Sequence, residues 1–258
     1  MAIKKGDKDL RTAIVAQYAV LERSGLNVGT AGNISVRNGD KMLITPSGVP
    51  VETLRPDLIA EMPINGEYGA WLGPLKPSSE WRFHLDIMRA RPDVGAIVHM
   101  HPIFCCALAM LHRPILAAHY MIAIFGGSIV KCTKYAPYGT KELADFVVDG
   151  LGDRHAVLLG NHGALTTGAD LASAMNRARE LENLARMYYY AIAVGKPAIL
   201  SDDEAMHTVE RFKTYGAAPQ AQKVPPAPKK RTAASKAKAK TKAKAKPAPR
   251  KKKTRPTA

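Results

Sequence analysis

The chain has 258 residues, 46% of them apolar, which is enough to bury a large hydrophobic core. Its formal net charge of +16 would suit a nucleic-acid-binding protein, but residues 217–258 hold 15 of the 38 Lys and Arg side chains and no acidic residue. The first 216 residues therefore carry 23 basic and 22 acidic groups, which excludes a basic surface spread over the whole chain.

The composition also bears on location. No apolar run reaches the roughly 18 residues of a membrane-spanning helix, and the first residues, MAIKKGDKDLRTA, lack the apolar stretch of a secretory signal. The chain contains Cys105, Cys106 and Cys132, and adjacent cysteines such as the first two rarely bridge each other. We expect a cytoplasmic protein whose cysteines are small core residues.

Helical and strand-like patterns alternate before the basic segment. Helices are predicted at residues 10–23, from about Ser78 onward, and at 104–111, 140–151, 169–194 and 202–213. Short strands are predicted at residues 33–36, 42–44, 58–62, 94–99 and 156–159. We detect no internal repeat, and the pattern indicates a single α/β or α+β domain in which helices cover a sheet.

Segments rich in small and hydroxyl-bearing residues lie between these elements. They are GTAGNIS at residues 29–35, TPSG at 45–48, and Ser78-Ser79, which begins a predicted helix. Each alone is typical of a turn or a helix cap. Together they offer backbone N–H groups, hydroxyls, an amide and a helix N-terminus, which are the groups that hold a phosphate dianion.

Glu80 is predicted to lie in the first turn of that helix. An acidic residue there is typical of a cap or of a partner for the helix dipole. A carboxylate beside a phosphate-binding helix end and a metal could instead transfer protons. The local sequence leaves both interpretations open.

Two histidines, His99 and His101, end the strand-like run AIVHMHP. Residues i and i+2 of a strand point to the same face, so this pair could bind one metal ion or could simply be polar residues that close a strand. His162 follows another apolar run and is flanked by Gly160 and Gly163, which allow close backbone approach. Three histidines at two strand ends would form an open site for zinc or a similar divalent metal. We interpret the other histidines as surface or satisfied core residues: His84, His112, His119, His155 and His207.

Taken in order, these segments resemble those of the class II aldolase/adducin-like family, and most closely its L-fuculose-1-phosphate aldolases. The resemblance runs over residues 8–216, through GLNVGTAGNISVR, MLITPSGVP, LKPSSEWRFHLDIMRARPDVGAIVHMHP, HYMIAIFGG, LLGNHGALTTG and LSDDEAMHTVERFKTYG. It implies a three-layer α/β/α catalytic domain over residues 1–216, with a mainly antiparallel central sheet covered by helices.

The resemblance also implies a role for each motif residue. His99, His101 and His162 would be the ligands of Zn²⁺, and Glu80 would occupy or leave the fourth position and act as acid/base. Tyr120 would donate a proton in the active site of a neighbouring subunit, which implies a homotetramer with active sites at its interfaces. The residues implied to hold or cover the phosphorylated substrate are Thr30, Gly32, Asn33, Ser47, Gly48, Ser78, Ser79, Phe212 and Tyr215, with Tyr138 at the aldehyde end.

The implied reaction is the zinc-dependent cleavage of a ketose 1-phosphate into dihydroxyacetone phosphate and an aldehyde. The motifs do not separate L-fuculose 1-phosphate from 5-deoxyribulose 1-phosphate or 5-methylthioribulose 1-phosphate. The same fold hosts sugar-phosphate 4-epimerases and decarboxylases, although HYMIAIFGG favours an aldolase. A different class, a non-catalytic adducin-like interaction protein with a nucleic-acid-binding tail, requires no metal site, and the three histidines argue against it.

The segment 217–258 lies outside the resemblance. It consists largely of Lys, Ala and Pro and has no large apolar residue after Val224, so we predict that it is disordered. It could contact nucleic acid or another polyanion by neutralising phosphates. It could equally be a passive extension, because no aromatic residue lies between the charges to stack on bases.

Overall fold

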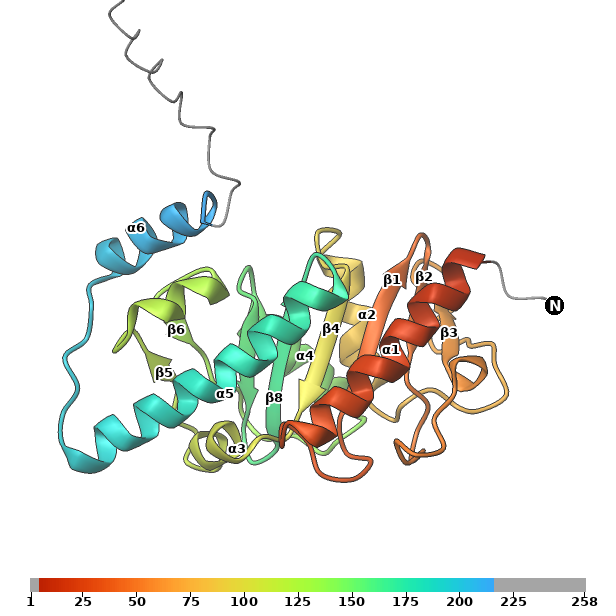
Figure 1. The fold of residues 1–258 in the computed structure, drawn as a ribbon, viewed down its shortest axis with the longest axis horizontal. Helices are drawn as coiled ribbons and strands as arrows, with labels where there is room; N and C mark the ends of the chain where they lie inside the picture. The colour runs from red at the N-terminus through yellow and green to blue at the C-terminus, as the bar shows by residue number, and fades with distance from the viewer. Residues whose placement is uncertain (1–4, 216–258) are drawn as a thin grey trace, which may run out of the picture. The chain divides into compact units, whose positions relative to one another are not determined.

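The computed structural model of the chain describes residues 5–215 (Figure 1). The predictions made for the basic segment 217–258 fall outside these residues and stay predictions. Among the described helices, none is long and apolar enough to cross a membrane.

A six-stranded sheet forms the centre of the fold, and every neighbouring pair of its strands is antiparallel. Its order is β3-β2-β1-β4-β8-β7. The strands are β1 (Asn33–Asn38), β2 (Lys41–Ile44), β3 (Ala60–Pro63), β4 (Ala96–Met100), β7 (Ala156–Leu159) and β8 (Gly163–Gly168). A second sheet has two strands, β5 (Ile115–Leu116) and β6 (Ile129–Val130).

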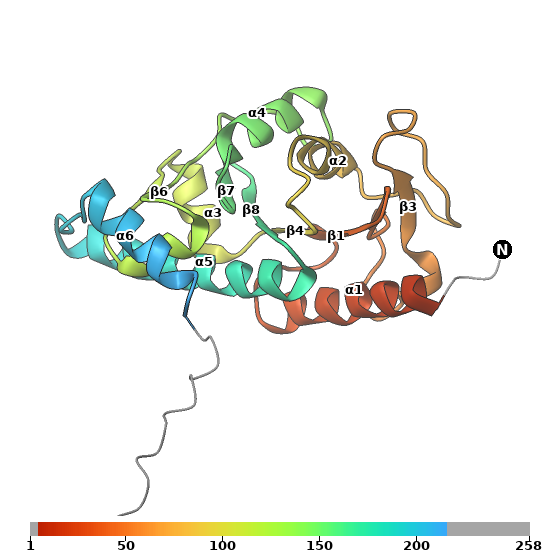
Figure 2. The same ribbon diagram turned by 90° about the horizontal axis from the view of Figure 1, so that it is seen from above.

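Helices cover both faces of the central sheet. The helices of the chain are α1 (Lys5–Arg23), α2 (Trp81–Ala90), α3 (Ile103–Met110), α4 (Lys141–Leu151), α5 (Leu171–Val194) and α6 (Asp202–Phe212), with the 3-10 helices η1 (Pro56–Leu58) and η2 (Tyr120–Phe125). Of these, α6 packs against η2. Figure 2 shows α1 and α5 on one side of the strands and α2 and α4 on the other. Two hydrophobic cores result, one on each face, so the predicted three-layer arrangement with a mainly antiparallel sheet is confirmed.

The alternation of side chains along β4 separates these two cores. Ala96, Val98 and Met100 pack into the core under α1 and α5, whereas Ile97 belongs to the core under α2 and α4. His99 follows Ile97 on that second face and stacks edge-on against Phe83 of α2, with ring centroids 5.4 Å apart. A polar ring therefore takes the place of an apolar side chain where the strand approaches its end.

The start of α2 differs from the prediction. The helix begins at Trp81, so Glu80 is its N-cap residue rather than a residue of its first turn, and the Glu80 side chain makes no capping hydrogen bond. The hydroxyl of Ser78 instead accepts a hydrogen bond from the Glu80 backbone N–H at 3.3 Å. The Glu80 carboxylate is thus free of the helix end.

Strand β8, which lies between β4 and β7, is absent from the predicted elements. Its sequence, GALTTG, has glycine at both ends and lacks the run of large apolar residues that marks a buried strand. The predicted strand at 58–62 is also shifted, because residues 56–58 form the 3-10 helix η1 and β3 begins at Ala60. The other predicted strands and helices are present. The first helix begins at Lys5 rather than at residue 10, and the remaining ends differ by at most two residues.

Candidate metal centre

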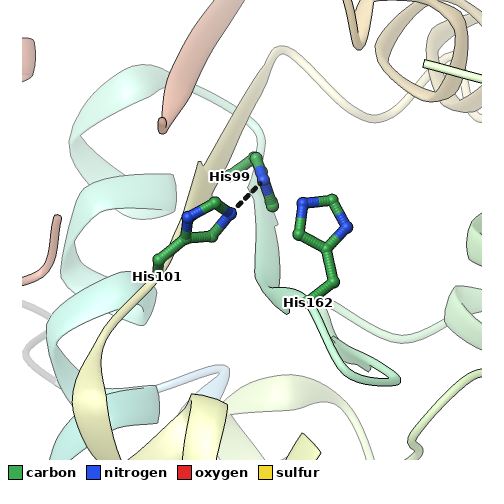
Figure 3. Close-up of side chains that lie close together, drawn as sticks. All are labelled: His99, His101 and His162. Carbon is green, nitrogen blue, oxygen red and sulfur yellow. Dashed lines mark hydrogen bonds between the residues drawn. The ribbon is translucent and has the colours of Figure 1, made fainter. Parts of the chain in front are cut away.

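Three histidines meet at one end of the central sheet (Figure 3). Strand β4 runs antiparallel to β8, with Met100 opposite Ala164, so the end of β4 lies beside the turn that joins β7 to β8. That turn carries His162. His99 lies on β4, and His101 is the first residue after the end of that strand. Each histidine offers one ring nitrogen, and these atoms all lie within 4.8 Å of one another.

His99 is the most firmly fixed of the three. Its side chain is fully buried, and its Nδ1 lies 3.0 Å from the backbone oxygen of Ala164 on β8. Because a carbonyl oxygen can only accept, Nδ1 carries the proton and Nε2 keeps a lone pair for a metal. The Nε2 atoms of His99 and His101 lie 3.0 Å apart (Figure 3).

The glycine after His162 makes room for the ring of His101. A Cβ atom placed on Gly163 would lie 2.6 Å from the backbone oxygen of Met100 and would collide with the His101 ring. This glycine therefore allows β8 to approach β4 closely where the two histidines face each other. The expectation of close backbone approach at this turn is confirmed.

The turn that carries His162 is fastened to α3. Asn161 has a φ of 52°, and its backbone N–H donates to the oxygen of Ala109 at 3.1 Å. Its side-chain oxygen lies 2.5 Å from Nε2 of His112, which also has a positive φ. These contacts fix the backbone immediately before His162.

Glu80 completes the cluster. Its Oε2 lies 3.1 Å from Nε2 of His99, and its Oε1 lies 3.3 Å from Nε2 of His162. Asn33 donates a hydrogen bond from Nδ2 to Oε2 at 3.0 Å. Oε1 is buried and has no hydrogen-bond partner among the described residues.

This donor set fits a divalent metal ion. Three imidazole nitrogens form the kind of site that binds zinc and leaves a fourth position, which the Glu80 carboxylate could occupy or leave to water or substrate. A buried carboxylate oxygen without a hydrogen bond is costly unless a cation compensates it, and Oε1 of Glu80 is such an atom. The residues therefore match a metal site.

The protonation states of the cluster agree with this interpretation. Burial, followed by interaction with His99, lowers the pKa of His101 to about 3 and that of His162 to about 4. Burial raises the pKa of Glu80, but His99, His162 and the Asn33 hydrogen bond outweigh it and lower that pKa to about 2. His101 and His162 are therefore neutral and Glu80 is ionised at neutral pH, which are the forms that bind metal.

Two of the predicted phosphate-binding segments lie side by side. Ser78 N–H donates to the oxygen of Thr45 at 2.9 Å, and Ser47 N–H donates to the oxygen of Lys76 at 3.1 Å. A pocket of about 440 Å³ opens between them, lined by Ser47, Gly69, Trp71, Lys76, Pro77, Ser79, Trp81, Arg82, Tyr138 and Gly139. Two predicted residues, Ser47 and Ser79, thus share a pocket with two basic side chains that the sequence analysis did not single out.

The remaining phosphate candidates do not line this pocket. Thr30 and Gly48 are exposed, whereas Ser78 is buried against the backbone of Glu80. Gly32 packs against β4, where a Cβ atom would lie 2.9 Å from the backbone oxygen of His99. Asn33 contacts Glu80 and His84.

The predicted aromatic residues fall into two places. Tyr120 begins η2, and its ring lies 6.4 Å from that of Phe212 on α6, which lies 6.0 Å from that of Tyr215. We call these three residues the aromatic cluster; none of them hydrogen-bonds or stacks with the three histidines within residues 5–215. Tyr138 lines the pocket that contains Ser47 and Ser79, rather than joining this cluster.

His84 is a site-adjacent residue whose connection the sequence analysis missed. It is fully buried on α2, as expected for a satisfied core histidine, and its Nε2 hydrogen-bonds to Oδ1 of Asn33. The available signal was spacing, because residues four apart lie on one face of a helix and His84 follows Glu80 by four. The interpretation as a satisfied core residue is correct but omits its link to Glu80.

Comparisons with known proteins agree with the geometry. A family model described as the class II aldolase and adducin N-terminal domain matches residues 12–189. The chain is 47% identical over 207 residues to the 5-methylthioribulose-1-phosphate/5-deoxyribulose-1-phosphate aldolase of Rhodospirillum rubrum, covering 80% of this chain and 92% of that protein. It is 46% identical over 208 residues to the L-fuculose phosphate aldolase of Escherichia coli strain K12, covering 80% and 95%. A solved structure of an L-fuculose 1-phosphate aldolase matches with a TM-score of 0.76 and 38% identity, over 80% of this chain and 96% of that one.

Proposed function

The chain belongs to the class II aldolase and adducin family, and from this premise we propose that it is a zinc-dependent aldolase. It would cleave a ketose 1-phosphate into dihydroxyacetone phosphate and an aldehyde. The observation that carries the proposal is the cluster of one buried and two half-buried histidines around Glu80, whose Oε1 lacks a hydrogen-bond partner among residues 5–215. The names of the relatives support an aldolase and, among substrates, a small phosphorylated ketose.

His99, His101 and His162 would hold the metal. When bound there, Zn²⁺ would supply Lewis-acid stabilisation of the negative charge that develops on substrate oxygens as a carbon–carbon bond breaks. His99 keeps its Nε2 directed at the site because its Nδ1–H is committed to Ala164. This fixed tautomer makes His99 a ligand that needs no rearrangement.

Glu80 would transfer protons through its Oε1. Its other oxygen, Oε2, accepts the hydrogen bond of Asn33, so the carboxylate is held by one side and open on the other. A positioned carboxylate of this kind contributes to catalysis by taking a proton from a substrate hydroxyl and returning it later. Burial of Glu80 keeps bulk water from competing for that proton.

The substrate phosphate would bind at the hydroxyl-rich segments. Ser47 and Ser79 share a pocket with Lys76 and Arg82, and basic side chains beside hydroxyls suit a phosphate dianion. Thr30, Gly32, Asn33, Gly48 and Ser78 remain proposed contributors on the strength of the family resemblance. Tyr138, which the resemblance places at the aldehyde end, lines the same pocket.

As the carbon–carbon bond breaks, the hydroxyl that becomes the aldehyde loses a proton, and the carbon left on dihydroxyacetone phosphate gains one. Glu80 would take the hydroxyl proton, and the donor of the second proton, Tyr120, would come from a second subunit. Tyr120 is 52% exposed and packs with Phe212 of α6, so its hydroxyl is available to a neighbouring chain. We propose a homotetramer in which Tyr120 serves an adjacent site and Tyr215 covers bound substrate. We also propose that residues 1–216 form the catalytic domain of a cytoplasmic enzyme.

The decisive experiment is a coupled assay for dihydroxyacetone phosphate. The full chain would be supplied in turn with L-fuculose 1-phosphate, 5-deoxyribulose 1-phosphate and 5-methylthioribulose 1-phosphate. We expect release from at least one substrate, its loss after chelation, and its recovery on adding Zn²⁺. Absence of release from all three, with metal bound, would contradict the proposed activity; epimerisation of a pentose 5-phosphate in the same preparation would favour the 4-epimerase alternative.

The segment 217–258 is proposed to contact a polyanion. Its 15 basic side chains predict binding to DNA in a gel-shift assay that weakens steeply as salt rises. Removing residues 217–258 should abolish the shift while leaving aldolase activity unchanged. An equal shift from the shortened chain would contradict this proposal.

A further inference from the structure

A chain of buried polar side chains leads away from the metal centre into the layer under α2. It joins Glu80 to Asn33, Asn33 to His84, and His84 to Ser35 on β1. Asn33 Nδ2 lies 3.0 Å from Glu80 Oε2, and Ser35 Oγ lies 2.7 Å from Nδ1 of His84. The four side chains are 5% exposed or less, so water does not compete for these hydrogen bonds.

The chemistry of the two ends fixes the direction of every hydrogen bond in this chain. An ionised carboxylate can only accept, so Asn33 must turn its NH₂ group toward Glu80 and its oxygen toward His84. The amide oxygen is also only an acceptor, so Nε2 of His84 must carry a proton. Nδ1 of the neutral ring then accepts from the hydroxyl of Ser35. Donation thus runs one way, from Ser35 to Glu80.

The chain has a consequence for the two oxygens of Glu80. Oε2 is held by Asn33 and lies beside His99, while Oε1 faces His162 without a hydrogen-bond partner in residues 5–215. If the amide of Asn33 were free to turn over, its oxygen would face Oε2 and repel it. His84 prevents this by supplying the donor that the amide oxygen requires.

A purely structural role for His84 explains less. The buried neighbours of His84 on α2 are apolar, including Phe83, Leu85 and Met88, and an apolar ring would fill the same space. Burying a polar ring costs free energy unless its hydrogen bonds are made. In this core both ring nitrogens make hydrogen bonds, Nδ1 with Ser35 and Nε2 with Asn33, and Asn33 in turn binds Glu80.

We propose that His84 is a positioning residue that acts through Asn33 to hold the Glu80 carboxylate with Oε1 directed at the metal and substrate. The proposal rests on the proposed role of Glu80 as acid/base. It predicts that the donor at Nε2 matters rather than the shape of the ring. It also predicts that His84 has no effect when Asn33 is removed.

The test compares two substitutions at one position. His84→Phe keeps a ring of similar size but removes the donor, and we expect kcat to fall about tenfold or more, with KM and metal content unchanged. His84→Gln returns an N–H near the position of Nε2 and should recover most of that loss. If the wild-type protein has aldolase activity and His84→Phe has the same kcat, the inference is overturned.

A packing control and a double variant separate positioning from stability. Met88→Ala removes a buried side chain one turn along α2 and should lower the melting temperature without lowering kcat. Asn33→Ala combined with His84→Phe should be no slower than Asn33→Ala alone, because both changes break one path. Additive losses would mean that His84 acts by another route.

A spectroscopic measurement tests the inference without relying on activity. In the cobalt(II)-substituted full chain, the visible spectrum reports the metal's coordination and therefore the placement of Glu80. We expect His84→Phe to alter this spectrum and His84→Gln to match the wild type. Identical spectra in all three proteins would overturn the inference even if the proposed aldolase activity were absent, whereas altered spectra without activity would count against the proposed function alone.

Discussion

The metal centre and the aromatic cluster differ in how completely one chain builds them. His99 and Glu80 are 0% and 4% exposed, and each is fixed by hydrogen bonds within its own chain. Tyr120 and Tyr215 are 52% and 84% exposed, and within residues 5–215 their hydroxyls make no hydrogen bond. A metal requires ligands that are already in place, whereas a substrate and a neighbouring subunit require an open surface.

This difference separates the effects that substitutions should have. A change in the candidate metal centre should alter metal content or the chemistry at the metal. A change in the aromatic cluster should alter turnover while the metal stays bound. The predictions below test that separation, beginning with the largest effect.

His99→Ala should abolish both metal binding and aldolase activity, because it removes the ligand whose tautomer β8 fixes. Elemental analysis and the dihydroxyacetone phosphate assay measure the two effects. His207→Ala, at an exposed histidine on α6, is the control and should keep both. Full activity in a metal-free His99→Ala protein would show that the histidine cluster does not hold a metal required for the reaction.

Glu80→Gln should retain the metal and lose about 10²–10⁴-fold in kcat, the usual contribution of a general acid or base. The three histidines suffice for binding, whereas an amide cannot take up a proton at this position. Metal content and kcat should be measured on the same preparation. An unchanged kcat would remove Glu80 from the proposed chemistry.

The sequence alone predicts that three histidines come together, for a physical reason. The i, i+2 spacing of His99 and His101 predicts that both side chains point to one face if the strand continues that far, and the apolar run before them marks that strand. In the structure β4 ends at Met100, and His101 still reaches His99 from the residue after the strand. His162 could be added because it also follows an apolar run. The pairing that brings it close could not be predicted, since it depends on β8, whose glycines and threonines gave no strand signal.

Other features depend on contacts between segments far apart in the chain. The local sequence left two interpretations open for Glu80, a cap or dipole partner of the helix and a group that transfers protons. In the structure α2 begins at Trp81, and the Glu80 carboxylate contacts His99 and Asn33 instead of the helix end. Asn33 and His84 are 51 residues apart, so no local pattern connects them. Local spacing therefore predicts histidines that come together in the fold, while the contacts that orient them become visible only in the folded chain.

Tyr120→Phe should slow turnover by about 10²-fold, the lower end of the range for a lost proton donor, while metal content and assembly stay unchanged. Tyr190→Phe, at another exposed tyrosine, is the control and should match the wild type. Size-exclusion chromatography with light scattering reports the assembly. A normal rate in Tyr120→Phe would exclude this hydroxyl as the proton donor.

Mixing variants tests whether Tyr120 serves a neighbouring subunit. The Tyr120→Phe chain keeps Glu80, and the Glu80→Gln chain keeps Tyr120, so a site formed between the two chains would contain both groups. We expect co-refolded mixtures to be more active than either variant alone. If no mixture is more active than the two variants from which it is made, the aromatic cluster acts within its own chain. The candidate metal centre and the aromatic cluster would then differ less than proposed.

Gly163→Ala should weaken metal binding by about 10- to 100-fold, the range seen when groups that support a ligand are changed. A Cβ atom at residue 163 would press on the ring of His101 and on the backbone oxygen of Met100, so the ring must leave its place beside His99. Gly6→Ala is the matched control, because a Cβ atom there meets nothing within 4 Å. Competition with a chromophoric chelator gives the affinity, and added Zn²⁺ should restore most of the activity of Gly163→Ala if only the position of His101 has shifted. Because the added Cβ atom would press on His101, an unaltered affinity would mean that the backbone around His101 adjusts readily. The histidine cluster would then be less rigid than its hydrogen bonds indicate.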